Sequence, residues 1–122
     1  MSVLIDSNVI IYAAIPRNHE LRRFIAARAP AVSVVSFVEV LGYRRLTKQD
    51  RRYFEDFFIA APVLQISIEI LDRATRLRQQ RNIGLGDALI GATALCHKLR
   101  LLTANTDDFK WIPSLQLVNP MA

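Results

Sequence analysis

The chain has 122 residues, 52% of them hydrophobic, and its 16 basic and 11 acidic side chains leave a formal charge of +5 at pH 7. This length and composition predict one compact domain over residues 1–122, and they exclude a membrane-spanning protein because no apolar run approaches roughly 20 residues. We expect a cytoplasmic protein without a leader sequence, since no basic segment precedes the N-terminal apolar run and the single Cys96 cannot form an internal disulfide.

Short apolar runs alternate with segments of helical periodicity along the chain. In chain order we expect a strand at 2–6, helices at 7–15 and 19–29, a strand at 31–35, helices at 36–46 and 48–61, a strand at 62–67, helices at 68–82 and 86–99, a strand at 100–105, and a turn leading to a last short strand at 116–118. This alternation indicates an α/β sandwich with a mainly parallel sheet of four or five strands. In such sheets, functional sites lie beyond the carboxyl ends of the strands.

Three helix starts carry polar side chains that could act as caps. The helix after the first strand is expected to begin at Ser7 or Asn8, and Ser36 with Glu39 has the S-x-x-E spacing of a capping box. The small-residue helix in GLGDALIGATAL begins with a single carboxylate, Asp87, which could cap it or point into a site.

An acidic side chain follows each of four segments that lie far apart in the sequence. Asp6 ends the first strand, Glu39 lies in the first turn after the second, and Asp87 opens the small-residue helix. Asp107 and Asp108 follow the strand in RLLTAN. Each acid alone could cap a helix or stabilise a turn, but together they are expected at one edge of the sheet.

Carboxylates brought within roughly 4 to 6 Å raise one another's pKa, so a cation is expected between them. Mg²⁺ and Mn²⁺ prefer oxygen ligands, whereas the isolated His19 and His97 offer no site for zinc. A divalent ion held by acids lowers the pKa of bound water and stabilises charge on a phosphoryl oxygen. The chemistry indicated is phosphodiester hydrolysis.

Basic side chains concentrate in three stretches, at 22–23, 43–52 and 72–81. Such charge favours a polyanion, and nucleic acid is the commonest one. Solvated helix faces or a surface for an acidic protein partner are the alternatives.

The segments LIDSNVII, SFVEV, GLGDALIGATAL and LLTANTDDF, in this order, resemble those of PIN-domain ribonucleases, and within that superfamily the VapC-type toxins of bacterial toxin–antitoxin pairs. The likeness covers nearly the whole chain and implies a three-layer α/β/α sandwich. It implies a Mg²⁺- or Mn²⁺-dependent endoribonuclease that cuts a tRNA, rRNA or mRNA and leaves a 3′-hydroxyl and a 5′-phosphate. The implied partners are a second copy of the chain in a homodimer and a VapB-type antitoxin.

The resemblance also implies roles for individual residues. Asp6, Glu39 and Asp87 match the family's three recurrent acids, which bind the metal and position the attacking water. Many relatives carry a fourth acid two residues after the residue that matches Thr103, where this chain has Asn105. We expect Asp108 to take that place, with Asn105 as the alternative ligand, and one firmly bound ion rather than two. The polar groups expected to support the ligands are Asn8, Thr103, Asn105 and Asp107.

RNA phosphates are expected to meet the basic stretch in the middle of the chain. Its members are Arg44, Arg45, Lys48, Arg51 and Arg52. A non-catalytic RNA-binding or regulatory module of the same fold is the alternative, because Asn105 replaces an acid. A phosphoacceptor signalling domain is disfavoured, because LIDSN holds one acid instead of a pair and QLVNP holds no lysine.

Overall fold

Five short strands form one parallel sheet in the computed structural model, which describes residues 2–121. The strands are β1 (Val3–Ile5), β2 (Ala31–Ser33), β3 (Val63–Leu64), β4 (Arg100–Leu102) and β5 (Leu117–Val118). Their spatial order is β3-β2-β1-β4-β5, so β1 lies in the centre, with Leu4 opposite both Ala31 and Leu101. The prediction of a mainly parallel sheet is confirmed, with shorter strands than expected.

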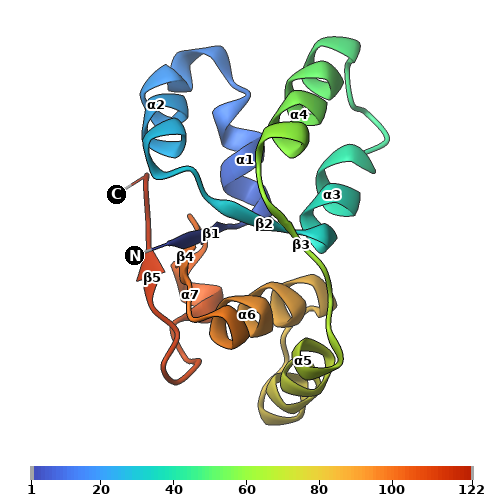
Figure 1. The fold of residues 1–122 in the computed structure, drawn as a ribbon, viewed down its shortest axis with the longest axis vertical. Coiled ribbons are helices and arrows are strands. Elements are labelled where there is room, and N and C mark those ends of the chain that lie inside the picture. The colour runs from blue at the N-terminus through green and yellow to red at the C-terminus, as the bar shows by residue number, and fades with distance from the viewer. Residues whose placement is uncertain (1, 122) are drawn as a thin grey trace.

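Helices cover both faces of the sheet and complete a three-layer α/β/α sandwich (Figure 1). One face carries α1 (Ser7–Ala13), the 3₁₀ turn η1 (Pro16–Asn18), α2 (His19–Arg28), α3 (Val34–Leu41) and α4 (Lys48–Ala60). The other carries α5 (Ile68–Gln80), α6 (Leu85–His97) and α7 (Thr106–Phe109). This arrangement agrees with the expected fold class.

The central strand divides its side chains between two hydrophobic cores. Leu4 packs with residues of α5, α6 and α7, whereas Ile5 packs with residues of α1 to α4. Both side chains are fully buried. A strand buried on both faces needs an unbroken apolar run, which explains the segment VLI before the first acid.

The small residues of α6 allow this helix to pack closely inside its layer. A Cβ at Gly91 would stand 3.3 Å from Ile112 Cδ1, so a larger residue would force that side chain to move. Four consecutive residues from Gly91 to Ala94 are fully buried or nearly so. The apolar, small-residue character of GLGDALIGATAL is therefore a packing requirement that leaves only its first turn for chemistry.

The capping box predicted from Ser36 and Glu39 is wrong. Helix α3 begins two residues earlier, at Val34, and Ser33 is its N-cap, with Ser33 Oγ accepting a hydrogen bond from Val35 N at 3.1 Å. Ser36 is instead buried inside the helix. The strand thus ends at Ser33 and the helix ends at Leu41, which places the following basic residues in a loop.

Two further boundaries differ from expectation. The N-cap of α1 is neither Ser7 nor Asn8 but Asp6, for which a capping role was the alternative, and its carboxylate accepts a hydrogen bond from Ser7 N. The turn expected after β4 contains the short helix α7, which begins at Thr106 and buries Phe109 completely. The burial of Phe109 fixes this segment against α6, where its ring lies next to Gly91.

Candidate metal centre

The four elements that carry the predicted acids end or begin at the same edge of the sheet. Asp6 follows β1, Glu39 lies in α3 directly after β2, and Asp87 lies in the first turn of α6. Thr103 follows β4, which pairs with β1. Because all strands run parallel, their carboxyl ends meet there, and the expected convergence of these side chains is observed.

Asp6 is the most enclosed of these acids. Its side chain is 4% exposed, with Oδ1 accepting a hydrogen bond from Ser7 N at 2.8 Å and Oδ2 accepting one from Thr103 Oγ1 at 2.7 Å. Thr103 Oγ1 in turn accepts a hydrogen bond from Asn105 N at 3.0 Å. The carboxylate is therefore held in one orientation from both sides, as a metal ligand requires.

Glu39 is linked to the same edge through Ser7. Ser7 Oγ donates a hydrogen bond to Glu39 Oε1 at 2.6 Å and is also hydrogen-bonded to Ser36 Oγ at 2.8 Å. The other carboxylate oxygen, Oε2, lies so close to Gly86 that it would collide with a Cβ there. Glu39 thus reaches across from α3 to the first turn of α6, next to Asp87.

Sequence reasoning treated Ser7 and Ser36 as caps and gave Gly86 no role in the site. In the structure, the missing side chain of Gly86 makes room for Glu39. No local signal could have revealed these contacts, because they join residues about 30 positions apart or more. A serine directly after the first acid was the available hint for Ser7.

Gly86→Ala is expected to displace Glu39 while leaving the fold intact, because the atom in its way is the far end of a flexible side chain. For the phosphodiester hydrolysis expected from the sequence, this variant should be about tenfold or more slower, corresponding to a loss of roughly 1.4 kcal/mol in transition-state stabilisation. Initial rates of cleavage of a labelled RNA with Mg²⁺ measure this effect.

Gly91→Ala is the matched control on the same helix, since a Cβ at Gly91 would displace only the far end of the Ile112 side chain, which is not one of the acids. It should retain the wild-type rate. Equal rates for the two variants would contradict the placement of Glu39 beside Asp87.

The electrostatics of the cluster show that its negative charges are not balanced. Burial raises the pKa of Asp6 from 3.8 to about 6, with the charges of Asp87 and Glu39 adding to it and the hydrogen bonds from Thr103 and Ser7 opposing it. Burial likewise raises the pKa of Asp87, helped by the charges of Asp108 and Glu39. The carboxylates therefore repel one another at neutral pH and favour a bound cation.

Asp87 does not act as a cap. The N-cap of α6 is Gly84, and the Asp87 carboxylate makes no hydrogen bond within the part of the chain that the structure describes. Asp87 is thus a half-buried carboxylate with a raised pKa that accepts no hydrogen bond. Such a group can bind a cation.

The donor set fits a hard divalent ion. Among residues 2–121, no three His, Cys, Asp or Glu side chains already form a set that could hold a metal, and Glu39 is hydrogen-bonded to Ser7 through one of its oxygens. The buried Asn8 Oδ1 has no partner within the same range and is free to accept a hydrogen bond. Mg²⁺ commonly uses one or two carboxylates and keeps several waters, so a full protein cage is unnecessary.

The segment after β4 separates its two acids. Asp108 faces Asp87 closely enough to raise its pKa, and both line the same pocket. Asp107 borders this pocket too, but its side chain is 87% exposed and pairs with Lys110 at 3.0 Å. Asn105 is exposed, and its backbone rather than its side chain contacts Thr103. Of the candidates for the fourth acid, Asp108 is the one that the structure brings to Asp87.

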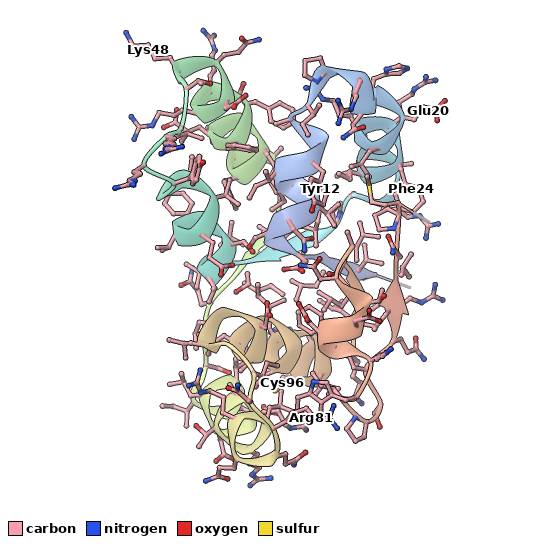
Figure 2. The ribbon with its side chains drawn as sticks, turned by 180° about the vertical axis from the view of Figure 1, so that it is seen from behind. Tyr12, Glu20, Phe24, Lys48, Arg81 and Cys96 are labelled. Carbon is pink, nitrogen blue, oxygen red and sulfur yellow. The ribbon has the colours of Figure 1, made fainter. Side chains whose placement is uncertain are left out.

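The predicted RNA-binding residues lie in the loop between α3 and α4 and along α4, all of them exposed. Figure 2 shows Lys48 at one tip of the molecule, far from the sheet, and Arg81 toward the opposite end. The start of α4 is therefore remote from the sheet edge that carries the acids.

Within residues 2–121, each helix is too short or too polar to span a membrane.

Comparisons with known proteins point to one family. A family model described as PIN domain matches residues 3–114. Ribonuclease VapC10 from Mycobacterium tuberculosis is 33% identical, over 93% of this chain and 90% of its own length, and Ribonuclease VapC1 from Rickettsia felis is 29% identical over 97% and 96%. Among solved structures, a toxin–antitoxin complex from Klebsiella pneumoniae is 33% identical with a TM-score of 0.81, covering 98% of both chains. VapBC2 from Rickettsia felis bound to a promoter DNA fragment, at 22% identity over 98% of both chains and a TM-score of 0.85, is similar in fold.

Proposed function

The chain belongs to the PIN-domain family, and from this membership we propose that it is a divalent-metal-dependent endoribonuclease and the toxin of a VapBC-type toxin–antitoxin pair, with residues 1–122 as one nuclease domain. The observation that carries the proposal is the set of mutually repelling carboxylates at the carboxyl edge of the sheet. Two relatives that this chain matches over nearly their whole length are named ribonucleases, and they support the reaction class.

The metal would be held by the acids of this edge together with water. We assign this role to Asp6, Glu39, Asp87 and Asp108, with Mg²⁺ or Mn²⁺ as the ion. When bound, such an ion lowers the pKa of water and stabilises charge on a phosphoryl oxygen.

The chain's own polar groups orient these acids. Thr103 and Ser7 N fix the carboxylate of Asp6, and the hydroxyl of Ser7 fixes one oxygen of Glu39. The unpartnered Asn8 Oδ1 can accept a hydrogen bond from a water molecule or from a ribose hydroxyl of the RNA. Held in this way, the carboxylates would align a water with the phosphate and accept its proton. The water oxygen would bond to phosphorus while the bond from phosphorus to the 3′-oxygen breaks, and that oxygen would take up a proton from solvent, which leaves a 3′-hydroxyl and a 5′-phosphate.

Two protein partners complete the proposal. An apolar pocket of about 370 Å³, lined by residues such as Ile11, Ile15 and Leu46, offers a VapB-type antitoxin a surface between α1 and the start of α4. The exposed Phe37 and Val38 on α3 offer apolar area for a second copy of the chain in a homodimer. The structures of toxin–antitoxin complexes among the relatives support the antitoxin partner.

The direct test is cleavage of RNA by the purified chain. Cleavage of total RNA should require Mg²⁺ or Mn²⁺, stop on addition of EDTA and resume when the metal is restored in excess. The products should ligate as 5′-phosphates and extend as 3′-hydroxyls. RNA binding without turnover, at every metal concentration tried, would overturn the nuclease and favour a non-catalytic RNA-binding module.

A further inference from the structure

Two side chains beside the acids, Arg81 and Trp111, take no part in the proposed metal centre. A pocket of about 230 Å³ lies between the loop at 81–84 and α7, and its lining includes Asp87, Asp108 and Trp111. Arg81, the residue after the last turn of α5, stands at its rim with the guanidinium carbon 5.0 Å from the centre of the Trp111 ring. The pocket therefore combines a cation and an aromatic ring next to two acids of the proposed centre.

The position of Arg81 is fixed through Trp111. The indole Nε1 of Trp111 donates a hydrogen bond to Asp108 O at 3.0 Å, so the ring is anchored to the same short helix that carries Asp108. Cation–π stacking then holds the guanidinium over the ring. A flexible, exposed arginine thereby gains a defined place without the help of a carboxylate.

Arg81 does not neutralise the acids that surround it. It forms none of the ion pairs found between described residues, and the charges that act on Asp87 are those of Asp108 and Glu39. Its N–H groups that do not face the ring are free to bind an anion. An arginine held beside a cluster of acids, and paired with none of them, is poised for a negatively charged ligand.

An RNA substrate has such a charge on either side of the bond that is cut. The acids repel these phosphates unless a cation compensates, and a guanidinium can bind a phosphate with two parallel hydrogen bonds. Resting on the proposed function, we propose that Arg81 binds the phosphate of a nucleotide that flanks the scissile bond, and that Trp111 is the positioning residue that holds Arg81 there. This subsite would steer the strand into the pocket beside Asp87.

The chain contains a matched control for this pair. Arg28 lies over the Phe24 ring at 4.7 Å on α2, on the other face of the sheet from α5 and α7. Arg28 is exposed, like Arg81, and it forms none of the ion pairs found between described residues. Removing either arginine lowers the net charge by one, so only a local role distinguishes the two variants.

The experiment compares Arg81→Ala, Arg28→Ala and the wild type for cleavage with Mg²⁺ and for binding of a fluorescent single-stranded RNA in EDTA. Arg81→Ala should raise KM and weaken binding about tenfold, the loss of one charged hydrogen-bonding group. The slope of log affinity against log salt should fall by about 0.7, as for one phosphate contact with a single strand. Arg28→Ala should stay within about twofold of the wild type, and equal losses in the two variants would overturn the subsite.

The role of Trp111 is tested by Trp111→Phe and Trp111→Leu, with melting curves to show that each variant folds. Trp111→Phe keeps a ring for stacking and should bind RNA better than Trp111→Leu. The double variant that combines Trp111→Leu with Arg81→Ala should bind RNA no worse than Arg81→Ala alone, because Trp111 acts only through the arginine. Additive losses would overturn the positioning role.

The outcomes separate this inference from the nuclease itself. A wild type that cleaves RNA with the same KM as Arg81→Ala keeps the nuclease and overturns the subsite. A wild type that binds RNA in an Arg81-dependent way but cuts none keeps the subsite and overturns the nuclease. A wild type that neither binds nor cuts RNA overturns both.

Discussion

Asp87→Asn is expected to abolish RNA cleavage and to leave the fold intact. The Asp87 carboxylate has no hydrogen bond to lose within residues 2–121, and its pKa is already raised by burial and by the charges of Asp108 and Glu39. Asparagine occupies the same volume, removes that repulsion and is a poorer ligand for a divalent ion. A loss of several kcal/mol of transition-state stabilisation corresponds to a decrease of about a thousandfold or more in rate.

Asp107→Asn is the matched control for this experiment. It makes the same change of charge at the border of the same pocket, but the Asp107 side chain is 87% exposed and pairs with Lys110 at 3.0 Å. Cleavage by this variant should stay within about twofold of the wild type. The proposed centre would be refuted if Asp87→Asn retained cleavage or if both variants lost it equally. Titration of Mn²⁺ into each protein should show lost binding only for Asp87→Asn.

The metal-free protein is expected to become less stable as pH rises from about 4 to about 6. The pKa of Asp6 is about 6 in the folded chain and 3.8 in the reference state, so the folded chain binds more protons across this window. Stability is therefore greatest below pH 3.8 for this group and lowest above about 6. The difference between the two pKa values amounts to about 3 kcal/mol.

Urea unfolding in EDTA, at several pH values between 4 and 7.5, measures this effect against Asp6→Asn. Asparagine is an equally good N-cap, so it can keep the start of α1 while removing the titration. The free energy of unfolding should fall more steeply with pH in the wild type than in the variant. Parallel curves would refute the raised pKa of Asp6. At pH 7.5, Mg²⁺ should stabilise the wild type and have little effect on the variant.

The sequence predicted the architecture because its cause is local. Five short apolar runs, of which the first three are each followed by segments of helical period, allow few arrangements other than a parallel sheet with helices on both faces. The carboxyl ends of parallel strands meet at one edge, so the sequence alone predicts that Asp6, Glu39 and Asp87 lie close together. Family membership supports the same architecture over residues 3–114.

The errors arose where two residues satisfied the same local rule. Both Ser33 and Ser36 can cap a helix, and Glu39 made Ser36 the better candidate by spacing. Ser36 is instead buried against Ser7, which leaves Ser33 in the extended conformation of an N-cap. Because that contact joins residues 29 positions apart, the choice of cap depended on tertiary packing.

In the site, too, some features follow from the sequence alone and others from the tertiary structure. The sequence alone determines which acids the chain carries and near which expected strand or helix each one lies, although Glu39 lies in the second turn of α3 and not in its first. Which partners those acids have depends on contacts that only the folded chain makes. Thr103 is hydrogen-bonded to Asp6, from which it is separated by 97 positions, and Ser7 to Glu39, from which it is separated by 32. Arg81 lies over the ring of Trp111, which belongs to another segment. Local rules of periodicity and capping cannot encode such pairs, since they are set by how three packed layers bring distant segments to one edge of the sheet.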